Sequence, residues 1–141
     1  MKKITSNSVF TLVLCSTFLF SCSFGPSNQE VITLATPHGY VLKLEVQKKG
    51  KSQKMEETKV FSYTVYMKFI SSGMKFGYIA ECPTRQCFND IEYETVKEFL
   101  VVKNEWDKWE IYKSRIIQEK EIGRYWRPTA QSLEEFYKDL K

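Results

Sequence analysis

Two stretches of the chain place an apolar residue at every second position, and this alternation limits the possible fold more than any other feature. Phe61, Tyr63, Val65, Met67 and Phe69 would share one face of a strand, because successive side chains of a strand point to opposite faces. Residues 40–47 repeat the pattern, with apolar residues at positions 40, 42, 44 and 46. Each stretch therefore predicts a half-buried strand.

A hairpin is predicted after the strand at residues 61–69. The tripeptide Ser71-Ser72-Gly73 can turn the chain, and the alternation then resumes at Met74, Phe76, Tyr78 and Ala80. Two alternating runs joined by a short segment with glycine are typical of paired antiparallel strands. We expect residues 61–69 and 74–80 to pair with each other.

The two ends of the region from residue 30 to residue 141 carry local signals of secondary structure. Residues 30–36 are short and β-branched and precede Pro37-His38-Gly39, which favours a strand that ends in a turn. At the other end, Ser132 and Glu135 have the spacing of a capping box, and the apolar residues that follow are at helical spacing. This pattern predicts a short amphipathic helix that packs on the sheet.

The segment from residue 89 to residue 128 is less regular. Asn89 and Glu92 could cap a short helix over residues 89–100 that passes into a strand at 99–103, although a strand throughout would fit the same residues. Residues 104–108 contain turn formers, and 109–117 resume a strand, so a second hairpin is expected. Gly123 and Pro128 are expected to interrupt any long element after it.

These elements give an α+β, β-rich fold, an antiparallel meander or small barrel of five to seven strands with a C-terminal amphipathic helix. About 112 residues, from 30 to 141, form a single domain. The chain shows no internal repeat or low-complexity tract.

The first 21 residues have the order of an export signal. Lys2 and Lys3 precede a 12-residue apolar run from Val9 to Phe20, which is the pattern of a secretory signal peptide. A membrane-spanning helix needs about 20 such residues, so the run is expected to be a signal and not an anchor.

The end of this signal, Leu19-Phe20-Ser21-Cys22, resembles the lipobox of bacterial lipoproteins. The resemblance implies transfer of diacylglycerol to the Cys22 thiol and cleavage after Ser21, so that palmitate-type acyl chains anchor the protein in a membrane. Ser23 after the cysteine favours the outer membrane in cells that have two membranes. Phe20 departs from the usual small or branched residue at its position.

Residues 22–29, rich in Ser, Gly and Pro, are expected to be a tether between lipid and domain. Loss of Lys2 and Lys3 with the signal lowers the formal net charge from +4 to +2. So small an excess, together with export, argues against a nucleic-acid partner.

The cysteines are consistent with an oxidising compartment. Once Cys15 leaves with the signal and Cys22 carries lipid, Cys82 and Cys87 are the remaining thiols. We expect them to form a disulfide. A redox motif would have two residues between its cysteines, and a zinc site would need more ligands than the single histidine, His38, can add.

No motif for catalysis, metal or cofactor is recognised, and we expect none of the three. His38 falls in a predicted turn and is interpreted as an exposed turn residue. The paired glutamates lie in polar runs with lysines, which is typical of solvated surface. A small enzyme with an unrecognised carboxylate site is retained as an alternative.

Two groups of residues are candidate binding surfaces. Tryptophan and arginine are enriched at binding hot spots, and one candidate surface consists of Trp106, Arg124, Tyr125, Trp126 and Arg127. The other is a basic run that could contact an anionic membrane or polymer, with Lys48, Lys49, Lys51 and Lys54. In a small domain the aromatic residues could instead be core, and the lysines could protect a strand edge.

The sequence thus predicts a lipid-anchored, noncatalytic binding or assembly module of the cell envelope, with an envelope protein or polymer as its partner. A second interpretation is an inhibitor of an envelope-directed enzyme such as lysozyme, which rests on size and location alone.

Overall fold

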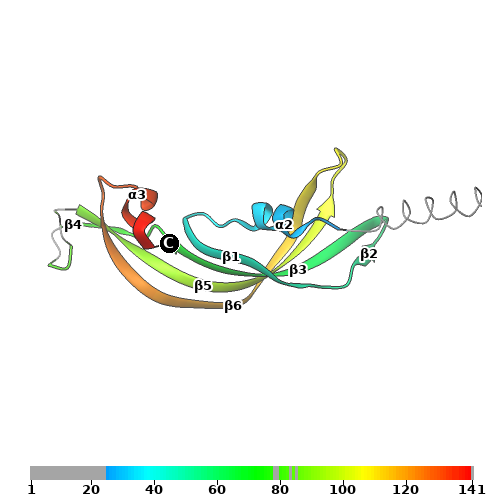
Figure 1. Cartoon of the computed structure of the whole chain (residues 1–141), viewed down its shortest axis with the longest axis horizontal. Helices are drawn as coiled ribbons and strands as arrows, with labels where there is room; N and C mark the ends of the chain where they lie inside the picture. Colours follow the sequence, from blue (N-terminus) through cyan, green and yellow to red (C-terminus); the bar gives the residue numbers. More distant parts are fainter. Residues whose placement is uncertain (1–24, 78–79, 83, 85, 141) are drawn as a thin grey trace, which may run out of the picture.

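The computed structural model describes residues 25–77, 80–82, 84 and 86–140. Six strands and three short helical segments follow one another along this part of the chain (Figure 1). They are α2 (Asn28–Ala35), β1 (Tyr40–Lys49), β2 (Gln53–Met55), β3 (Thr58–Ser71), β4 (Lys75–Gly77), β5 (Gln86–Lys103), β6 (Trp109–Pro128), α3 (Leu133–Tyr137) and the 3-10 helix η1 (Lys138–Leu140).

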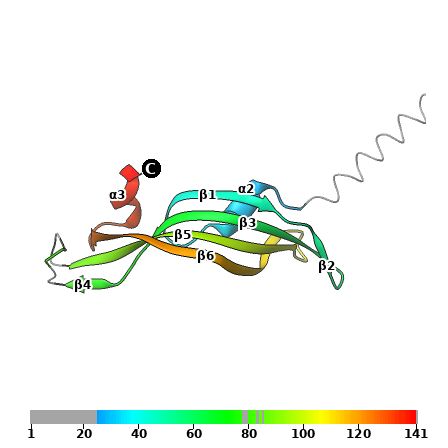
Figure 2. The ribbon, with the colours of Figure 1, turned by 90° about the horizontal axis from the view of Figure 1, so that it is seen from below.

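The strands form one antiparallel meander, as predicted, and the sheet does not close into a barrel. The long strands lie in chain order, β1 beside β3, β3 beside β5 and β5 beside β6, while β2 and β4 extend the sheet at its ends. Figures 1 and 2 show a long, strongly bent and twisted sheet, with α3 toward the end where β4 lies and α2 beside the middle of the sheet.

The strand predicted over residues 30–36 is wrong, because this segment is the helix α2. Its N-terminus has a capping box: the Ser27 hydroxyl accepts from the Glu30 amide at 3.3 Å, and the Glu30 carboxylate accepts from the Ser27 amide at 2.8 Å. The Ser27 amide and hydroxyl both donate to the Glu30 carboxylate and hold the pKa of Glu30 below its ordinary value. Val31 and Ala35, four residues apart, face the sheet, so tertiary packing decides against the β-branched composition.

The alternating face of β3 forms the larger core. Tyr63, Val65 and Met67 are fully buried and pack with residues of α2 and β5, namely Val31, Ala35, Phe61, Phe99 and Val101. The side chains of this predicted strand therefore point as the sequence indicates. β1 contributes Leu44 and Val46 to the same core.

Residues 25–29, assigned by sequence to a tether, belong to the folded domain. The buried Tyr63 hydroxyl donates to the Pro26 carbonyl oxygen at 2.7 Å. A Cβ atom on Gly25 would lie 2.5 Å from the Phe61 ring, so the chain passes too close to that ring for a larger residue. The folded part therefore begins at least as early as Gly25, and residues 22–24 lie outside the described structure.

The hairpin predicted between residues 61–69 and 74–80 is wrong. β3 pairs with β5 over Phe61–Ser71, and β4 pairs with β5 further along the same edge. Residues 72–74 join β3 to β4 without reversing the chain, and the Asn89 amide donates to the Met74 carbonyl at 2.9 Å. A Cβ on Gly73 would lie 1.6 Å from the Asn89 carbonyl oxygen, so this link requires glycine.

The helix favoured at residues 89–100 is also wrong, and the alternative that the sequence left open, a strand, is correct. β5 runs without interruption from Gln86 to Lys103. A cap at Asn89 could satisfy a few backbone groups locally, whereas this strand pairs on both of its edges. The break expected at Gly123 is likewise wrong, because β6 runs through this residue, whereas Pro128 is the last residue of β6, as the sequence predicts.

The predicted disulfide is present. Cys82 and Cys87 are bonded, with Cα atoms 5.8 Å apart. The bridge closes the link between β4 and β5. Its loop is short, so the chain-entropy estimate of its contribution is about 2 kcal/mol against the unfolded state.

The predicted C-terminal helix is confirmed, including its capping box between Ser132 and Glu135. Tyr137 packs with Tyr40 and Ile70 in a second, smaller core. Ile70 is three residues beyond Met67 in a regularly paired strand, so it points to the opposite face. The two cores therefore use opposite faces of β3.

Candidate binding surface

β6 is the outer strand of the sheet and is solvent-exposed over most of its 20 residues. In the described part of the chain it pairs with β5 alone. The core beneath α2 is centred on β3 and β5, so most of β6 lies beyond the cover of either helix. A long outer strand leaves a row of backbone groups available to another chain.

Three bulges in β6 expose large apolar side chains. The register with β5 shifts at three places, and each shift adds one residue to β6: Tyr112, Ile117 and Ile122. These side chains are 58%, 53% and 37% exposed. With two apolar neighbours they form a row that we call the outer-strand surface, which consists of Ile111, Tyr112, Ile116, Ile117 and Ile122.

Natural sheet edges are commonly protected by bulges and by lysine or proline. β6 has the bulges, but its added residues are isoleucine and tyrosine. Charges of both signs lie between them, including Lys113 and Glu119, and Arg115 is paired with Glu98 at 2.9 Å. The arrangement has apolar anchors within a mixed polar surround, as protein-binding surfaces do.

The aromatic and arginine residues proposed from the sequence do not form one surface. Trp106 lies in the turn before β6 and is 72% exposed, whereas the other four residues lie near the far end of β6. β6 has 20 residues, and at about 3.3 Å per residue a strand of that length spans up to roughly 60 Å. Trp126 packs edge-on against Phe76, with ring centroids 5.5 Å apart.

Tyr125, Arg124 and Arg127 are engaged in contacts within the domain. The Tyr125 hydroxyl donates to the buried Glu92 carboxylate, and this hydrogen bond raises the pKa of Tyr125. Arg124 forms an ion pair with Glu121 at 2.5 Å, which lowers the pKa of Glu121 and raises that of Arg124. Arg127 is 5% exposed and belongs to a buried cluster.

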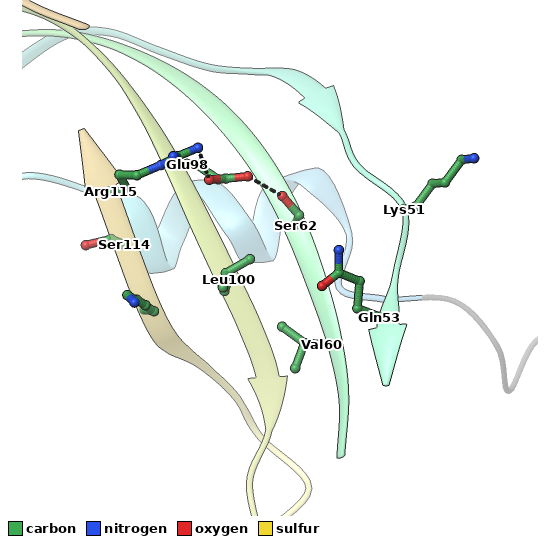
Figure 3. A pocket seen from close by; sticks show the side chains of 9 residues that line it. Lys51, Gln53, Val60, Ser62, Glu98, Leu100, Ser114 and Arg115 are labelled. Carbon is green, nitrogen blue, oxygen red and sulfur yellow. Dashed lines mark hydrogen bonds and ion pairs between the residues drawn. The ribbon is translucent and has the colours of Figure 1, made fainter. Parts of the chain in front are cut away.

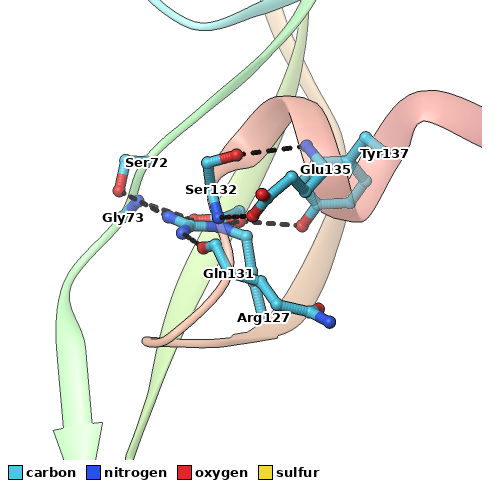
Figure 4. Close-up of polar contacts among 8 residues, drawn as sticks. Ser72, Gly73, Arg127, Gln131, Ser132, Glu135 and Tyr137 are labelled. Carbon is cyan, nitrogen blue, oxygen red and sulfur yellow. Dashed lines mark hydrogen bonds and ion pairs between the residues drawn. The ribbon is translucent and has the colours of Figure 1, made fainter.

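That cluster joins the C-terminal helix to the sheet (Figure 4). Asp90, fully buried on β5, accepts from Arg127 Nε at 2.6 Å and from the Tyr137 hydroxyl at 2.8 Å. Arg127 also donates to the Ser72 hydroxyl at 3.1 Å and to the Gln131 carbonyl at 2.5 Å. Its guanidinium lies 4.5 Å from the centre of the Phe88 ring.

The buried carboxylates thus have structural partners. Asp90 is saturated by Arg127, Tyr137 and the Gly73 amide, and Glu92 pairs with Lys68 at 3.2 Å. No buried side-chain nitrogen or oxygen lacks a hydrogen bond in the described residues. A general acid or base needs a carboxylate that a substrate can reach, and neither of these side chains is accessible.

Sequence reasoning missed Asp90 and Tyr137 as polar partners of Arg127. Tyr137 was recognised as part of the apolar helix face, and its hydroxyl gave no further signal. Asp90 gives no such signal either, because Asn89 and Glu92 on either side of it have the spacing of a helix cap. An acidic residue at an inward position of a recognised strand would have indicated a buried partner.

Burial raises the pKa of the Tyr137 hydroxyl above its ordinary value near 10.0, and its hydrogen bond to Asp90 adds to this effect. Because the pKa is higher in the folded state than in the unfolded state, the protonated hydroxyl stabilises the domain fully below the unfolded-state pKa. This stabilisation is lost as the pH rises from the unfolded-state pKa toward the folded-state pKa. We therefore predict that the free energy of unfolding falls above about pH 10. Tyr137→Phe should reduce this dependence in denaturant titrations; an unchanged slope would contradict it.

The four lysines proposed as one basic surface point to different surroundings. Lys49 lies 5.7 Å from the centre of the Tyr63 ring, on the α2 side of the sheet. Lys48 is the next residue along β1 and is paired with Thr64, so it points to the other side. Lys51 lines one hollow and Lys54 another.

The hollow beside Lys51 has a volume of about 340 Å³ (Figure 3). Val60 and Leu100 contribute its apolar lining, and Lys51, Lys113 and Arg115 contribute its positive charge. Glu98 spans it, accepting from Ser62 at 3.1 Å and from Arg115 at 2.9 Å. The one carboxylate that lines this hollow, that of Glu98, is therefore paired with a hydroxyl and a guanidinium of the domain itself.

Metal ligands do not gather in the described structure. Residues 25–77, 80–82, 84 and 86–140 contain no group of three or more His, Cys, Asp or Glu side chains that could hold a metal ion. Within the same residues, no helix combines the length and the apolar character needed to cross a membrane. The lipidation prediction falls on Cys22, which lies outside the described residues.

Comparison of the chain with protein-family models, with curated proteins and with solved structures found no match.

Proposed function

We propose that this protein is a noncatalytic envelope lipoprotein, anchored through Cys22, whose domain binds an envelope protein through the outer-strand surface of β6. The observation that carries the proposal is the row of five exposed apolar side chains along a strand with an open edge. Fully burying an isoleucine side chain is worth about 1.5–3 kcal/mol, and these side chains, which are 36–58% exposed, keep part of that free energy available for association.

A protein partner fits this surface better than a carbohydrate polymer does. Four of the five side chains are isoleucine, which packs well against other apolar side chains, whereas sugar rings prefer flat aromatic faces. The open edge also offers backbone hydrogen bonds between the bulges, as in strand addition. The lysozyme-inhibitor interpretation stays a prediction, to be checked with the purified domain.

The lipid anchor is supported by the resemblance of Leu19-Phe20-Ser21-Cys22 to a lipobox. Gly25 already packs against Phe61, and a chain extends at most about 3.6 Å per residue. Gly25 is three positions after Cys22, so it would lie within roughly 11 Å of the acylated cysteine. Such a short connection would keep one end of the sheet against the membrane.

The proposal predicts that Ile117→Lys removes a partner without unfolding the domain. Ile117 is 53% exposed, so the change should alter stability by no more than about 0.5 kcal/mol, while a buried lysine would disfavour the complex. The matched control is Leu140→Lys, at a residue 54% exposed on the C-terminal 3-10 helix.

The measurement is quantitative mass spectrometry of proteins that co-purify with each variant from solubilised membranes. At least one protein should be retained by the unsubstituted chain and by Leu140→Lys and lost with Ile117→Lys. The same set of proteins with all three chains would refute the assignment of the surface.

A further inference from the structure

We propose that the turn between β5 and β6 is a second membrane contact, in which Trp106 enters the interface of the bilayer beside the lipid anchor. The inference rests on the anchoring at Cys22 proposed above. It adds an interaction surface that is separate from the outer-strand surface, and its partner is the bilayer interface itself.

Hydrogen bonds within the turn order the backbone that carries the exposed Trp106. The Asn104 side-chain oxygen accepts from the backbone amides of Trp106 and Lys108, each at 3.0 Å. The backbone amide of Asn104 donates to the Lys108 carbonyl oxygen at 2.8 Å. The Asp107 carboxylate forms an ion pair with Lys103 at 2.8 Å. Because the turn is already ordered, placing its indole in a membrane would cost little conformational entropy.

Trp106 differs from the other two tryptophans in its surroundings. It is 72% exposed, whereas Trp109 packs edge-on against Phe61 and Trp126 against Phe76. An indole has a large apolar body and a single polar N–H group, and it is favoured at membrane–water interfaces. The exposed indole at the end of a rigid turn has the chemistry of an interfacial anchor.

The turn lies at the end of the molecule where the chain would reach its lipid. Gly25 packs against Phe61, and the Phe61 and Trp109 ring centroids are 5.6 Å apart. Trp109 follows the turn directly. Figure 1 shows the turn, in yellow, rising beside α2, close to where the described chain begins. A membrane that held Cys22 would therefore lie near Trp106.

The charges of the turn indicate an apolar contact and not an electrostatic one. Two acidic residues, Glu105 and Asp107, accompany two basic ones, Lys103 and Lys108. Their balance gives the turn no net attraction to anionic lipids, so a zwitterionic bilayer should suffice and added salt should not release Trp106. Insensitivity to salt would distinguish this apolar contact from an electrostatic attraction between lysines and anionic lipids.

Such a contact would also orient the binding strand. β6 begins at Trp109, beside the turn, and ends at Pro128 near α3. With the turn at the membrane, β6 leads away from it, and Ile117 would lie about 25 Å along the strand from Trp109 at roughly 3.3 Å per residue. The outer-strand surface would then face partners that stand on the same membrane.

The experiment uses the mature lipidated protein in phosphatidylcholine vesicles whose acyl chains carry bromine, which quenches tryptophan fluorescence at short range. We expect quenching with the unsubstituted protein, its loss with Trp106→Phe, and its retention with Trp126→Phe, the matched control at the far end of the sheet. It should persist in high salt. Equal quenching in the two variants would overturn the proposal, as would release by salt.

Intact-mass spectrometry of the same sample separates the two proposals. A mass without acyl chains on Cys22 would overturn the anchoring, and the inference that rests on it as well. An acylated Cys22 with no quenching specific to Trp106 would overturn the second contact alone.

Discussion

Arg127→Ala should lower the free energy of unfolding by about 3–5 kcal/mol, because it leaves the Asp90 carboxylate buried without its cation. Asp90 is 0% exposed and receives two hydrogen bonds from the guanidinium. Truncation would also remove the donors to Ser72 and Gln131. The free energy of unfolding of native proteins is only about 5–15 kcal/mol, so this loss is a large fraction of the total stability.

The matched control is Arg115→Ala on the same strand. Arg115 also pairs with a carboxylate, that of Glu98 at 2.9 Å, but its side chain is 72% exposed. Exposed ion pairs contribute about 0–1 kcal/mol. Chemical denaturation of both variants checks the difference, and equal losses of stability would show that burial of the Asp90–Arg127 pair is not what matters.

Tyr63→Ala should lower the free energy of unfolding by a similar amount, about 3–5 kcal/mol, because it empties a large volume in the core beneath α2. Tyr63 is 0% exposed and its hydroxyl donates to the Pro26 carbonyl at 2.7 Å. The variant would therefore also release residues 25–27 from the sheet.

Two further variants divide this effect into its parts. Tyr63→Phe removes the hydroxyl alone and leaves a buried carbonyl unpaired, which should cost about 1–3 kcal/mol. Tyr112→Ala, at a tyrosine that is 58% exposed on β6, should change stability by less than about 0.5 kcal/mol. If Tyr63→Ala were as mild as Tyr112→Ala in thermal or chemical unfolding, the description of this core would be wrong.

The elements that the sequence predicts correctly are those with a strong local signal. The alternation from Phe61 to Phe69 places β3 and its buried face, since few other structures need period two. The turn formers at Asn104 and Asp107 place the β5–β6 connection, where Asp107 has a φ of 62° and asparagine and aspartate tolerate strained turns. The capping box at Ser132 places α3.

Most of the errors concern choices that local signals cannot make. The helix at residues 28–35 is the exception: the apolar run is too short for its period to separate helix from strand, but Ser27 and Glu30 have the same capping-box spacing as Ser132 and Glu135, and this spacing favours a helix. The partner of β3 is β5, not the next alternating run, because residues 72–74 continue in the same direction. Strand pairing is a property of the whole sheet and is only weakly encoded in neighbouring residues.

The candidate site was predictable in location but not in composition. The sequence directs attention to residues 106–127, and β6 occupies most of that range. It selects Arg127 and Tyr125 as exposed, whereas these side chains turn inward to Asp90 and Glu92. The exposed apolar row arises from bulges, which shift the faces of a strand and depend on its register with β5.

The outer-strand surface is tested most directly by photocrosslinking in intact cells from a photoreactive residue at position 117, with position 140 as the control. The two positions are similarly exposed, at 53% and 54%, but position 117 lies on β6 and position 140 lies on the C-terminal 3-10 helix. We predict a discrete covalent adduct with one envelope protein from position 117 and none of that size from position 140. No adduct at 117, or the same adduct from both positions, would contradict the account.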